Sequence, residues 1–355
     1  MNVLIIGFGY AGRRYQRAFS HLASKNGVDL TLAYVGRKSR TDVKPYYTQI
    51  GTALTEFRPD IVVVSVNDHS HVAVLRELAS FEGFIICEKP LAVPSDDWSG
   101  VCAGLSHIKG FALDLVERYS EATERLKEIV SQRQWSLVRS SFYWGKDRLN
   151  DYRPTCGVTS EIIHALDLVK WICTSQEPLQ LQQAIGIGSD FSISGDSIPD
   201  TVLLTATLGN APVAGYSSFV NIQRQRTVDF TFADPDGRIF HARIVYDTPN
   251  WDHDYLRIWS RDVSGYEVVE DEYRAVPQQS GLETVYKLSL LCDDAMRVTM
   301  GNSPRMPLAD LEVSKELQSL LDAISLQITA LPTARYVRGS ERILIPESAD
   351  LESLG

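Results

Sequence analysis

The chain is poor in cysteine and lacks the cysteine spacings that mark metal sites or disulfide scaffolds. Its 355 residues contain five cysteines and no CxxC pair. The five are Cys87, Cys102, Cys156, Cys173 and Cys292. An odd, scattered set of this kind is typical of free thiols in a reducing compartment. We predict free cysteines. We also predict no metal site, because no further candidate ligand accompanies the two acids and the histidine in residues 250–255.

The chain also lacks a long apolar run and an excess of positive charge. No uncharged apolar stretch approaches the roughly 20 residues that a membrane-spanning helix needs. The start, MNVLIIGFGYAGRR, has no basic segment before its apolar run and leads straight into glycines, so we expect no signal peptide. A net charge of -10 repels phosphate backbones. We therefore expect a cytoplasmic protein that binds neither membranes nor nucleic acid.

Residues 1–115 alternate between short β-rich runs and helical patterns. This alternation, with nearly continuous apolar strands, favours a parallel sheet covered by helices on both faces. The predicted strands are residues 3–6, 30–35, 61–66, 84–87 and 109–112, and the predicted helices are residues 11–24, 50–58, 71–80 and 96–106. We predict an α/β fold that begins with a dinucleotide-binding domain of the Rossmann type, a doubly wound parallel sheet.

Residues 116–355 are predicted to form an α+β domain for substrate binding and oligomerisation. Residues 180–275 are nearly all β in character, and Pro235-Asp236-Gly237 between two alternating runs is a strong hairpin signal. The other predicted elements are helices at 121–131, 159–173, 281–300 and 307–326, and strands at 136–144 and around Ile343 and Ile345. We expect a large, mostly antiparallel open sheet, and a terminal helix that can pack back on the first domain.

An open sheet of this kind has an apolar face that must be covered. A second copy of the chain provides such a cover. We therefore expect a homodimer or homotetramer formed through the C-terminal sheet.

Gly7, Gly9 and Gly12 form a G-x-G-x-x-G that follows a predicted strand and opens a predicted helix. Glycines at these positions let the backbone approach a pyrophosphate at the positive helix N-terminus. A tight turn that binds nothing is the alternative interpretation. We expect Gly7, Gly9, Tyr10, Ala11 and Gly12 to bind a dinucleotide.

The residues after the second predicted strand, AYVGRKSR, bear on the choice of dinucleotide. An NAD site has an acid at the tip of this strand to hold the ribose hydroxyls, whereas Gly36 stands here. Arg37, Lys38, Ser39 and Arg40 follow, and cations with a hydroxyl suit a 2′-phosphate. A solvated charged loop is the alternative. We predict that NADP(H) is preferred over NAD(H).

Two later segments, VNDHSH at residues 66–71 and Glu88-Lys89-Pro90, resemble motifs of the Gfo/Idh/MocA family of NAD(P)-dependent oxidoreductases. In that family the third strand runs into T-P-N-x-x-H, and a later strand ends in E-K-P. Here VNDHSH, residues 66–71, occupies the first position and keeps the histidine as His71. Glu88-Lys89-Pro90 matches the second motif without change. Both segments follow predicted parallel strands, so we expect them to share one rim with the glycine loop.

The resemblance continues to about residue 325. VERYSEATERLKEIV, from Val116, is similar to the V-E-R-F segment that opens the second domain, and LADLEVSKELQSLLDAIS is similar to the closing helix. CGVTSEIIHALDLVKWI resembles the G-G-x-x-x-D-x-G-x-H-x-x-D helix, with His164 and Asp167 at matching positions. The chain departs from that pattern at three positions. Ser160 replaces the acid before the histidine, and Cys156 and Ile162 replace glycines.

The resemblance implies that Lys89 and His164 carry the acid/base chemistry. Lys89 would hydrogen-bond a substrate oxygen and stabilise charge on it, and His164 would pass a proton to or from the alcohol. A surface ion pair between Glu88 and Lys89 is the alternative for the lysine. A core histidine bonded to Asp167 is the alternative for His164.

Further side chains are expected near the cofactor and the substrate. Asn67, His71, Glu88 and Lys89 are assigned to the cofactor, and Ser160, Asp167, Arg118 and Tyr152 to the substrate. For His71 a structural role is favoured over a cofactor contact. Asp167 either orients His164 or belongs to a polar core pair, and Arg118 equally fits a salt bridge that links the domains.

Together these features predict an NADP(H)-dependent oxidoreductase that interconverts a secondary alcohol and a ketone on a sugar, sugar nucleotide or polyol. The NADP(H) preference favours a keto-sugar reductase. One alternative within enzymes is reduction of an imine or a non-sugar carbonyl. Another alternative, motivated by Ser160, is a non-catalytic dinucleotide-binding sensor or scaffold.

Overall fold

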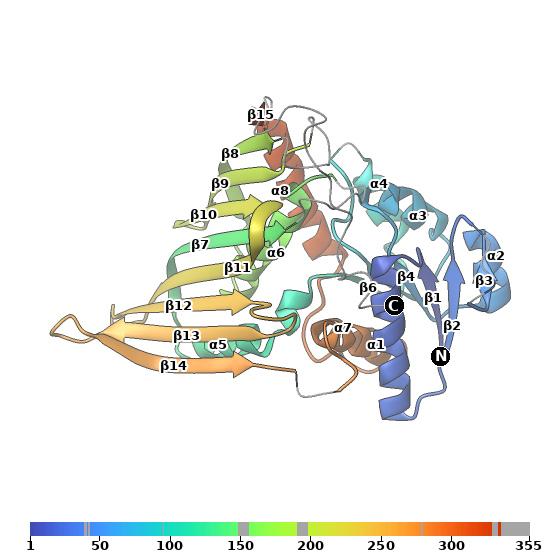
Figure 1. Cartoon of the computed structure of the whole chain (residues 1–355), viewed down its shortest axis with the longest axis horizontal. Coiled ribbons are helices and arrows are strands. Elements are labelled where there is room, and N and C mark those ends of the chain that lie inside the picture. Colours follow the sequence, from blue (N-terminus) through green and yellow to red (C-terminus); the bar gives the residue numbers. More distant parts are fainter. Residues whose placement is uncertain are drawn as a thin grey trace. The chain divides into compact units, whose positions relative to one another are not determined.

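The computed structural model describes residues 1–38, 41, 43–94, 96–147, 156–189, 198–277, 280–328 and 333–334. Within these residues the chain forms two compact units (Figure 1). The first contains residues 1–116 and 280–318, and the second contains residues 117–277 and 319–334. Residues 280–318 thus group with the N-terminal residues, although they follow the second unit along the chain.

The first unit is built on a six-stranded parallel sheet with the order β3-β2-β1-β4-β5-β6. Its strands are β1 (Asn2–Ile6), β2 (Thr31–Val35), β3 (Tyr46–Tyr47), β4 (Ile61–Val64), β5 (Phe84–Cys87) and β6 (Gly110–Leu113). Every residue of β4 and β5 is buried, as expected for strands covered on both faces. The predicted doubly wound parallel sheet is confirmed, and the two-residue edge strand β3 is an addition to it.

Helices of the first unit bury regularly spaced apolar residues. Their bounds are α1 (Tyr10–Asn26), α2 (Ile50–Phe57), α3 (His71–Glu77), α4 (Trp98–Gly104) and α7 (Tyr286–Thr299), with a 3-10 turn η1 (Asp68–Ser70). In α1, Tyr15, Ala18, Phe19 and Leu22 are buried at i, i+3, i+4 and i+7. The helix ends at Gly27, whose φ of 62° is left-handed. Helix α7 packs against α1.

All six strands of this sheet run in one direction. The segments that follow β1, β4 and β5 therefore leave the sheet at the same edge. These segments are the glycine loop, the Asn67–His71 stretch and the Glu88–Pro90 motif, so the expectation that they share one rim is confirmed.

The second unit is built on a nine-stranded, mostly antiparallel sheet with the order β14-β13-β12-β11-β7-β10-β9-β8-β15. Its strands are β7 (Ser136–Asp147), β8 (Leu179–Ser189), β9 (Thr201–Leu208), β10 (Ala211–Ser218), β11 (Val220–Ala233), β12 (Ile239–Tyr246), β13 (Asp254–Arg261), β14 (Glu267–Ala275) and β15 (Thr333–Ala334). The β10–β7 and β15–β8 pairs are parallel. The predicted hairpin at Pro235–Gly237 joins β11 and β12 and is confirmed. The late strand expected around Ile343 and Ile345 lies outside the described residues.

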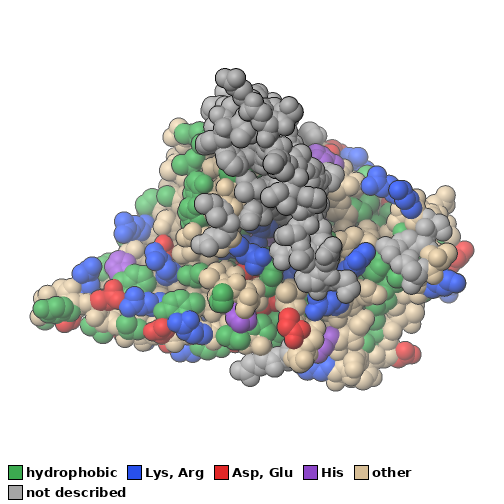
Figure 2. All heavy atoms as spheres, in the orientation of Figure 1, with side chains coloured by type: hydrophobic (Ala, Val, Ile, Leu, Met, Phe, Trp, Pro, Cys, Tyr) green, Lys and Arg blue, Asp and Glu red, His purple; other side chains and the backbone are tan. Residues whose placement is uncertain are grey.

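Among the described residues, helices cover one face of this sheet, and apolar side chains on the other face are exposed. A 3-10 turn η2 (Val116–Tyr119) leads into α5 (Glu121–Gln132), which packs on β12, β13 and β14. Helix α6 (Thr159–Ile172) packs on β7 and β10, and α8 (Leu311–Gln327) follows later in the chain. Ile185 on β8 and Leu203 on β9 are 49% and 41% exposed. Figure 2 shows hydrophobic side chains at the surface over β8–β10.

Two further observations concern the whole of the described chain. All five cysteines lie within it, and none of them forms a disulfide bond. None of its helices combines the length and the apolar character needed to cross a bilayer.

Candidate functional site

The glycine loop is shaped by two close backbone approaches. Gly7 has a φ of +95°, and a Cβ there would lie 2.6 Å from the Ser65 carbonyl oxygen. The Ser65 hydroxyl also donates to the Gly7 carbonyl oxygen at 2.8 Å. A Cβ on Gly12 would lie 2.2 Å from the Gly7 carbonyl oxygen. Only glycine fits either position, so the turn between β1 and α1 requires both.

The N-terminus of α1 fits an anion. Gly9 is its N-cap residue, no side chain caps it, and the first turn carries no acid. A Cβ on Gly9 would meet nothing within 4 Å. Backbone N–H groups at a helix N-terminus carry partial positive charge, which favours a phosphate. The loop from Gly9 through Tyr10 and Ala11 thus has the form that a dinucleotide pyrophosphate requires.

The tip of β2 carries cations and no acid. A Cβ on Gly36 would lie 2.1 Å from the Tyr46 hydroxyl, so Tyr46 of β3 covers this glycine. Arg37 and Lys38 follow and are exposed. Ser39 and Arg40, predicted at the same phosphate site, lie outside the described residues.

His71 links the segments that follow β4 and β5. Its ring is fully buried, with Nδ1 2.6 Å from the Pro90 carbonyl oxygen and Nε2 3.2 Å from the Val66 carbonyl oxygen. Burial lowers the pKa of this imidazole. These contacts give His71 a structural task, and its contact with a cofactor stays a prediction. Asn67 precedes η1 and accepts a hydrogen bond from the Ser70 hydroxyl at 3.2 Å.

Glu88 and Lys89 directly follow β5. The Glu88 N–H donates to the Val64 carbonyl oxygen at 2.9 Å, which extends the β5–β4 ladder by one residue. Burial, followed by the carboxylate of Asp114, raises the pKa of Glu88 well above its usual range. The Lys89–Pro90 peptide bond is cis. Glu88 therefore lies next to a second acid, a neighbour that the sequence motif alone does not reveal.

In the second unit, His164 is held by a carboxylate from another element. Its Nδ1 lies 2.7 Å from Glu117 Oε2, and both side chains are almost fully buried. Glu117 belongs to η2, whereas His164 belongs to α6. The His164 ring stacks on Trp144 of β7 at 5.8 Å and 17°. Nε2 has no hydrogen-bond partner among the described residues.

Asp167 pairs with Arg118, the residue next to Glu117. Arg118 Nε and Nη2 donate to Asp167 Oδ2 and Oδ1 at 2.7 and 2.5 Å. The guanidinium also lies over the Trp171 ring at 4.3 Å. Of the two interpretations of Asp167, the contacts match a polar core pair, and the carboxylate on His164 is that of Glu117. Both Arg118 and Asp167 lie in the second unit, so this salt bridge is internal to it.

The remaining substrate candidates are placed as follows. The Ser160 hydroxyl is buried and donates to the Gly157 carbonyl oxygen at 2.9 Å. Glu161, one residue on, forms an ion pair with Lys146 of β7 at 2.5 Å. Tyr152 lies outside the described residues. Substrate binding by Ser160, Asp167, Arg118 and Tyr152 therefore stays a prediction.

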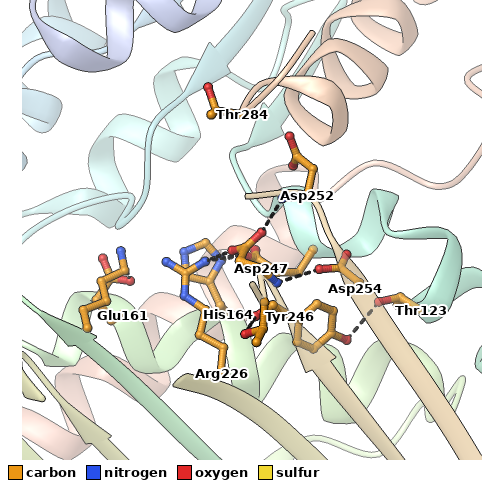
Figure 3. Close-up of polar contacts among 12 residues, drawn as sticks. Thr123, Glu161, His164, Arg226, Tyr246, Asp247, Asp252, Asp254 and Thr284 are labelled. Atoms are coloured by element: carbon orange, nitrogen blue, oxygen red, sulfur yellow. Dashed lines mark hydrogen bonds and ion pairs between the residues drawn. The ribbon is translucent and has the colours of Figure 1, made fainter. Parts of the chain in front are cut away.

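Arg226 is a site residue that the motifs did not indicate. It is 2% exposed, and its Nη1 donates to Glu117 Oε1 at 3.3 Å and to Asp247 Oδ2. Figure 3 shows Arg226 and Asp247 beside His164. The sequence does contain a signal for it, because Arg226 is in phase with the inward-facing Val228, Phe230 and Phe232 of β11. A buried arginine at an apolar position needs partners.

The loop after β12 orients Asp247. The Asp252 N–H donates to Asp247 Oδ1 at 2.9 Å, and the Asp247 N–H donates to Asp254 Oδ1 at 2.8 Å. These are the acids that flank His253 in residues 250–255, and here they fix the loop. Across the described residues there is no group of three or more His, Cys, Asp or Glu arranged to hold a metal ion.

Fold and site together define a two-unit α/β protein with an N-terminal dinucleotide-binding Rossmann unit. Residues 1–106 match the family model GFO_IDH_MocA, described as "Oxidoreductase family, NAD-binding Rossmann fold". Residues 1–106 thus resemble the NAD-binding Rossmann unit of the Gfo/Idh/MocA oxidoreductases.

A curated relative is inositol 2-dehydrogenase of Salmonella typhimurium. It is 18% identical over 178 residues, which cover 47% of this chain and 53% of the relative. The chain spans about half the length of the curated relatives it matches.

Several solved structures share the fold over 92% of this chain. Levoglucosan dehydrogenase, in complex with NADH and L-sorbose, has a TM-score of 0.72 at 13% identity and is covered to 96%. A super-repressor mutant of Gal80p from Saccharomyces cerevisiae has a TM-score of 0.71 at 14% identity and is covered to 95%. UDP-N-acetylglucosamine 3-dehydrogenase GnnA from Acidithiobacillus ferrooxidans has a TM-score of 0.66 at 15% identity and is covered to 97%. At these identities the likeness is one of fold.

Proposed function

We propose that the protein is an NADP(H)-dependent oxidoreductase that interconverts a secondary alcohol and a ketone on a sugar, sugar nucleotide or polyol. Within this class, it acts as a keto-sugar reductase. The observation that carries the proposal is the contact of 2.7 Å between Glu117 and His164 Nδ1.

The Glu117 carboxylate provides what the histidine motif lacks at Ser160. A carboxylate on Nδ1 favours the tautomer with hydrogen on that nitrogen and holds the ring in one orientation. Nε2 is then the nitrogen that exchanges a proton with the substrate oxygen. The second unit thus contains both members of an acid/base pair, Glu117 and His164. The carboxylate comes from η2 and not from α6.

The first unit supports the cofactor part of the proposal. The backbone from Gly7 to Gly12 would hold the pyrophosphate, and Arg37 and Lys38 would hold the 2′-phosphate. A bound nicotinamide supplies or accepts the hydride. Lys89 would hydrogen-bond the substrate oxygen and stabilise charge on it, while His164 gives a proton during reduction and takes one during oxidation.

The substrate class follows the relatives. Inositol 2-dehydrogenase, levoglucosan dehydrogenase and UDP-N-acetylglucosamine 3-dehydrogenase are all named for polyol or carbohydrate substrates. Exposed cations at the β2 tip support NADP(H), and NADP(H) preference favours reduction. These two arguments together support a keto-sugar as substrate.

A substrate screen tests this proposal. Purified protein is incubated with NADPH or NADH and a panel of keto-sugars, keto-sugar nucleotides, cyclic imines and heterocyclic carbonyls. The proposal expects NADPH oxidation with a keto-sugar, and loss of that activity in Lys89→Ala. Turnover restricted to the imines or to the non-sugar carbonyls would show that the proposed substrate class is wrong, while reduction by the dinucleotide would stand.

A non-catalytic dinucleotide-binding sensor is the second candidate. It is supported by Ser160, whose hydroxyl donates to Gly157 where the family pattern has an acid, and by the likeness to a Gal80p repressor. Tight NADPH binding with no turnover across the whole panel would favour this candidate over the reductase.

The outer face of the C-terminal sheet supports a homodimer or homotetramer. Ile185, Leu203, Tyr216 and Tyr143 are paired directly across β8, β9, β10 and β7, and each is at least partly exposed. Tyr143 and Tyr216 stack at 4.5 Å. Burial of a continuous, exposed apolar row by a second copy of the chain is favourable.

The five cysteines of the described residues form no disulfide bond, which supports a cytoplasmic location. Cell fractionation that recovered the protein outside the cytoplasm would contradict it.

A further inference from the structure

Two acids stand side by side where β5 and β6 end. Cys87 and Leu113 are paired in the parallel register of these strands, so Glu88 and Asp114 are the next residues on each. The Asp114 N–H donates to the Cys87 carbonyl oxygen at 2.8 Å, which continues the ladder to this position. Side chains at paired positions point to the same face, about 4.8 Å apart. Two ionised carboxylates at that spacing repel each other.

Asp114 is buried, and only one of its two carboxylate oxygens accepts a hydrogen bond from a described residue. The Tyr15 hydroxyl donates to Asp114 Oδ2 at 2.9 Å, and both residues are enclosed. Oδ1 is also buried, and no donor reaches it from any residue that the structure describes. A buried acceptor without a donor is costly. The neighbouring Glu88 carboxyl is the group that supplies one, provided that it carries a proton.

The surroundings of the pair agree with one shared proton. The titratable and charged groups that face the two acids are Arg14 and Tyr15 on α1, Cys292 on α7, and Cys87 and Lys89 on the β5 segment. Burial and then Asp114 raise the pKa of Glu88, and this outweighs the opposite effect of the two cations. Burial likewise raises the pKa of Tyr15 and of Cys292, so both groups stay neutral.

We propose that Glu88 and Asp114 share one proton, with Glu88 as a neutral acid that donates to the Asp114 carboxylate. Tyr15 is a positioning residue that holds the charged oxygen of Asp114. The pair then carries one negative charge in place of two at the rim of the dinucleotide-binding sheet.

A consequence for the cofactor rests on the proposed function. Dinucleotides bind at the carboxyl ends of the strands, where Glu88 directly follows β5. An oxidised nicotinamide ring is positively charged, whereas a reduced ring is neutral. Ionisation of Glu88 adds a negative charge at this rim, which favours the oxidised form. Rising pH is therefore expected to shift the binding preference from NADPH toward NADP⁺.

The shared proton has a signature in stability that requires no cofactor. Glu88 in the unfolded chain ionises near the ordinary value of 4.5, whereas in the native protein it keeps its proton to higher pH. The stability from this group is fully present below pH 4.5 and is lost as pH rises through the native pKa. Over that interval, the folded-to-unfolded ratio of wild type falls about tenfold per pH unit relative to Glu88→Gln.

Urea unfolding of the cofactor-free protein between pH 5 and 8 measures this ratio. Glu88→Gln should not show the loss of stability with rising pH that the wild type shows. Tyr15→Phe should still show it, because this change disturbs the same cluster but removes no group that titrates in this range. Parallel curves for wild type and Glu88→Gln would overturn the proposal. Infrared spectra of the wild type with carbon-13-labelled glutamate need no variant: a protonated glutamic acid band that persists above pH 5 supports it, and its absence overturns it.

Dissociation constants for NADP⁺ and NADPH at pH 6 and pH 8 test the consequence for the cofactor. The wild-type preference should move toward NADP⁺ by several-fold, and Glu88→Gln should show no such movement. If the unfolding result is obtained and neither dinucleotide binds, the shared proton stands and the proposed function fails. If the unfolding curves are parallel, the shared proton fails whatever binds.

Discussion

The carboxylate of Glu117 lies 2.7 Å from Nδ1 of His164, and the next residue, Arg118, forms a bidentate ion pair with Asp167. One turn of 3-10 helix thus holds two residues of α6 that stand three apart. The two adjacent side chains of η2 have different roles. The Glu117 carboxylate orients His164, and the Arg118 guanidinium neutralises the buried Asp167 carboxylate. Changes at Glu117 should therefore affect chemistry, and changes at Arg118 should affect stability.

The Arg118–Asp167 pair should be a large contributor to stability. Asp167→Ala leaves the Arg118 charge buried without its carboxylate, which costs about 3–5 kcal/mol. Urea unfolding measures the loss. Asp229→Ala is the matched control, because Asp229 forms a bidentate pair with Arg243 at 2.6 and 3.0 Å but with side chains that are 35% and 52% exposed. The control should lose no more than about 1 kcal/mol, and equal losses would contradict the burial argument.

Arg37 and Lys38 should discriminate NADPH from NADH. Each exposed cation that contacts a 2′-phosphate adds a charge-assisted hydrogen bond, so replacing both with alanine should weaken NADPH binding about tenfold or more. NADH binding should stay within about twofold, because NADH has no 2′-phosphate to contact. Fluorescence titration gives both constants. Lys25→Ala, at the far end of α1, is the control, and equal weakening of both cofactors would show that the loop is only a charged surface.

The outer face of the C-terminal sheet should mediate self-association. Leu203→Lys places a charge in the middle of the apolar row and should shift the protein toward the 39.7 kDa monomer in light scattering. Met300→Lys, at a residue 51% exposed beyond α7, makes the same kind of change elsewhere and should leave the assembly intact. A wild-type protein that is monomeric at micromolar concentration would contradict the prediction.

Local sequence patterns predicted most of the fold. The strand Phe84–Cys87 was predicted at the bounds that the structure has, because a short apolar run between a glycine and the Glu-Lys-Pro motif has few alternatives. The edge strand Tyr46–Tyr47 escaped prediction, since two residues carry no periodicity. Helix α7 begins at Tyr286, five residues later than predicted, because periodicity marks a helix face better than its ends.

The candidate site was less accessible from sequence, since its pairs join distant segments. The spacing of His164, Asp167 and Trp171 at i, i+3 and i+7 fits one face of a helix, but it does not show that Arg118 pairs with Asp167 or that Glu117 contacts the histidine. The same limit applies to Tyr15 and Asp114, which are 99 positions apart. Sequence motifs identified the residues of the rim, and only the fold showed their partners.

The central claim is that Glu117 makes His164 an effective acid/base group. Its most direct test is the steady-state reduction of the keto-sugar found in the screen, by wild type, Glu117→Gln and the matched exposed variant Glu128→Gln. We expect kcat for Glu117→Gln to fall by about 10²–10⁴-fold, the range of general acid–base catalysis, with KM changed little. Glu117→Asp should recover part of the loss, and Glu128→Gln should match wild type. A Glu117→Gln enzyme with wild-type kcat would contradict the account.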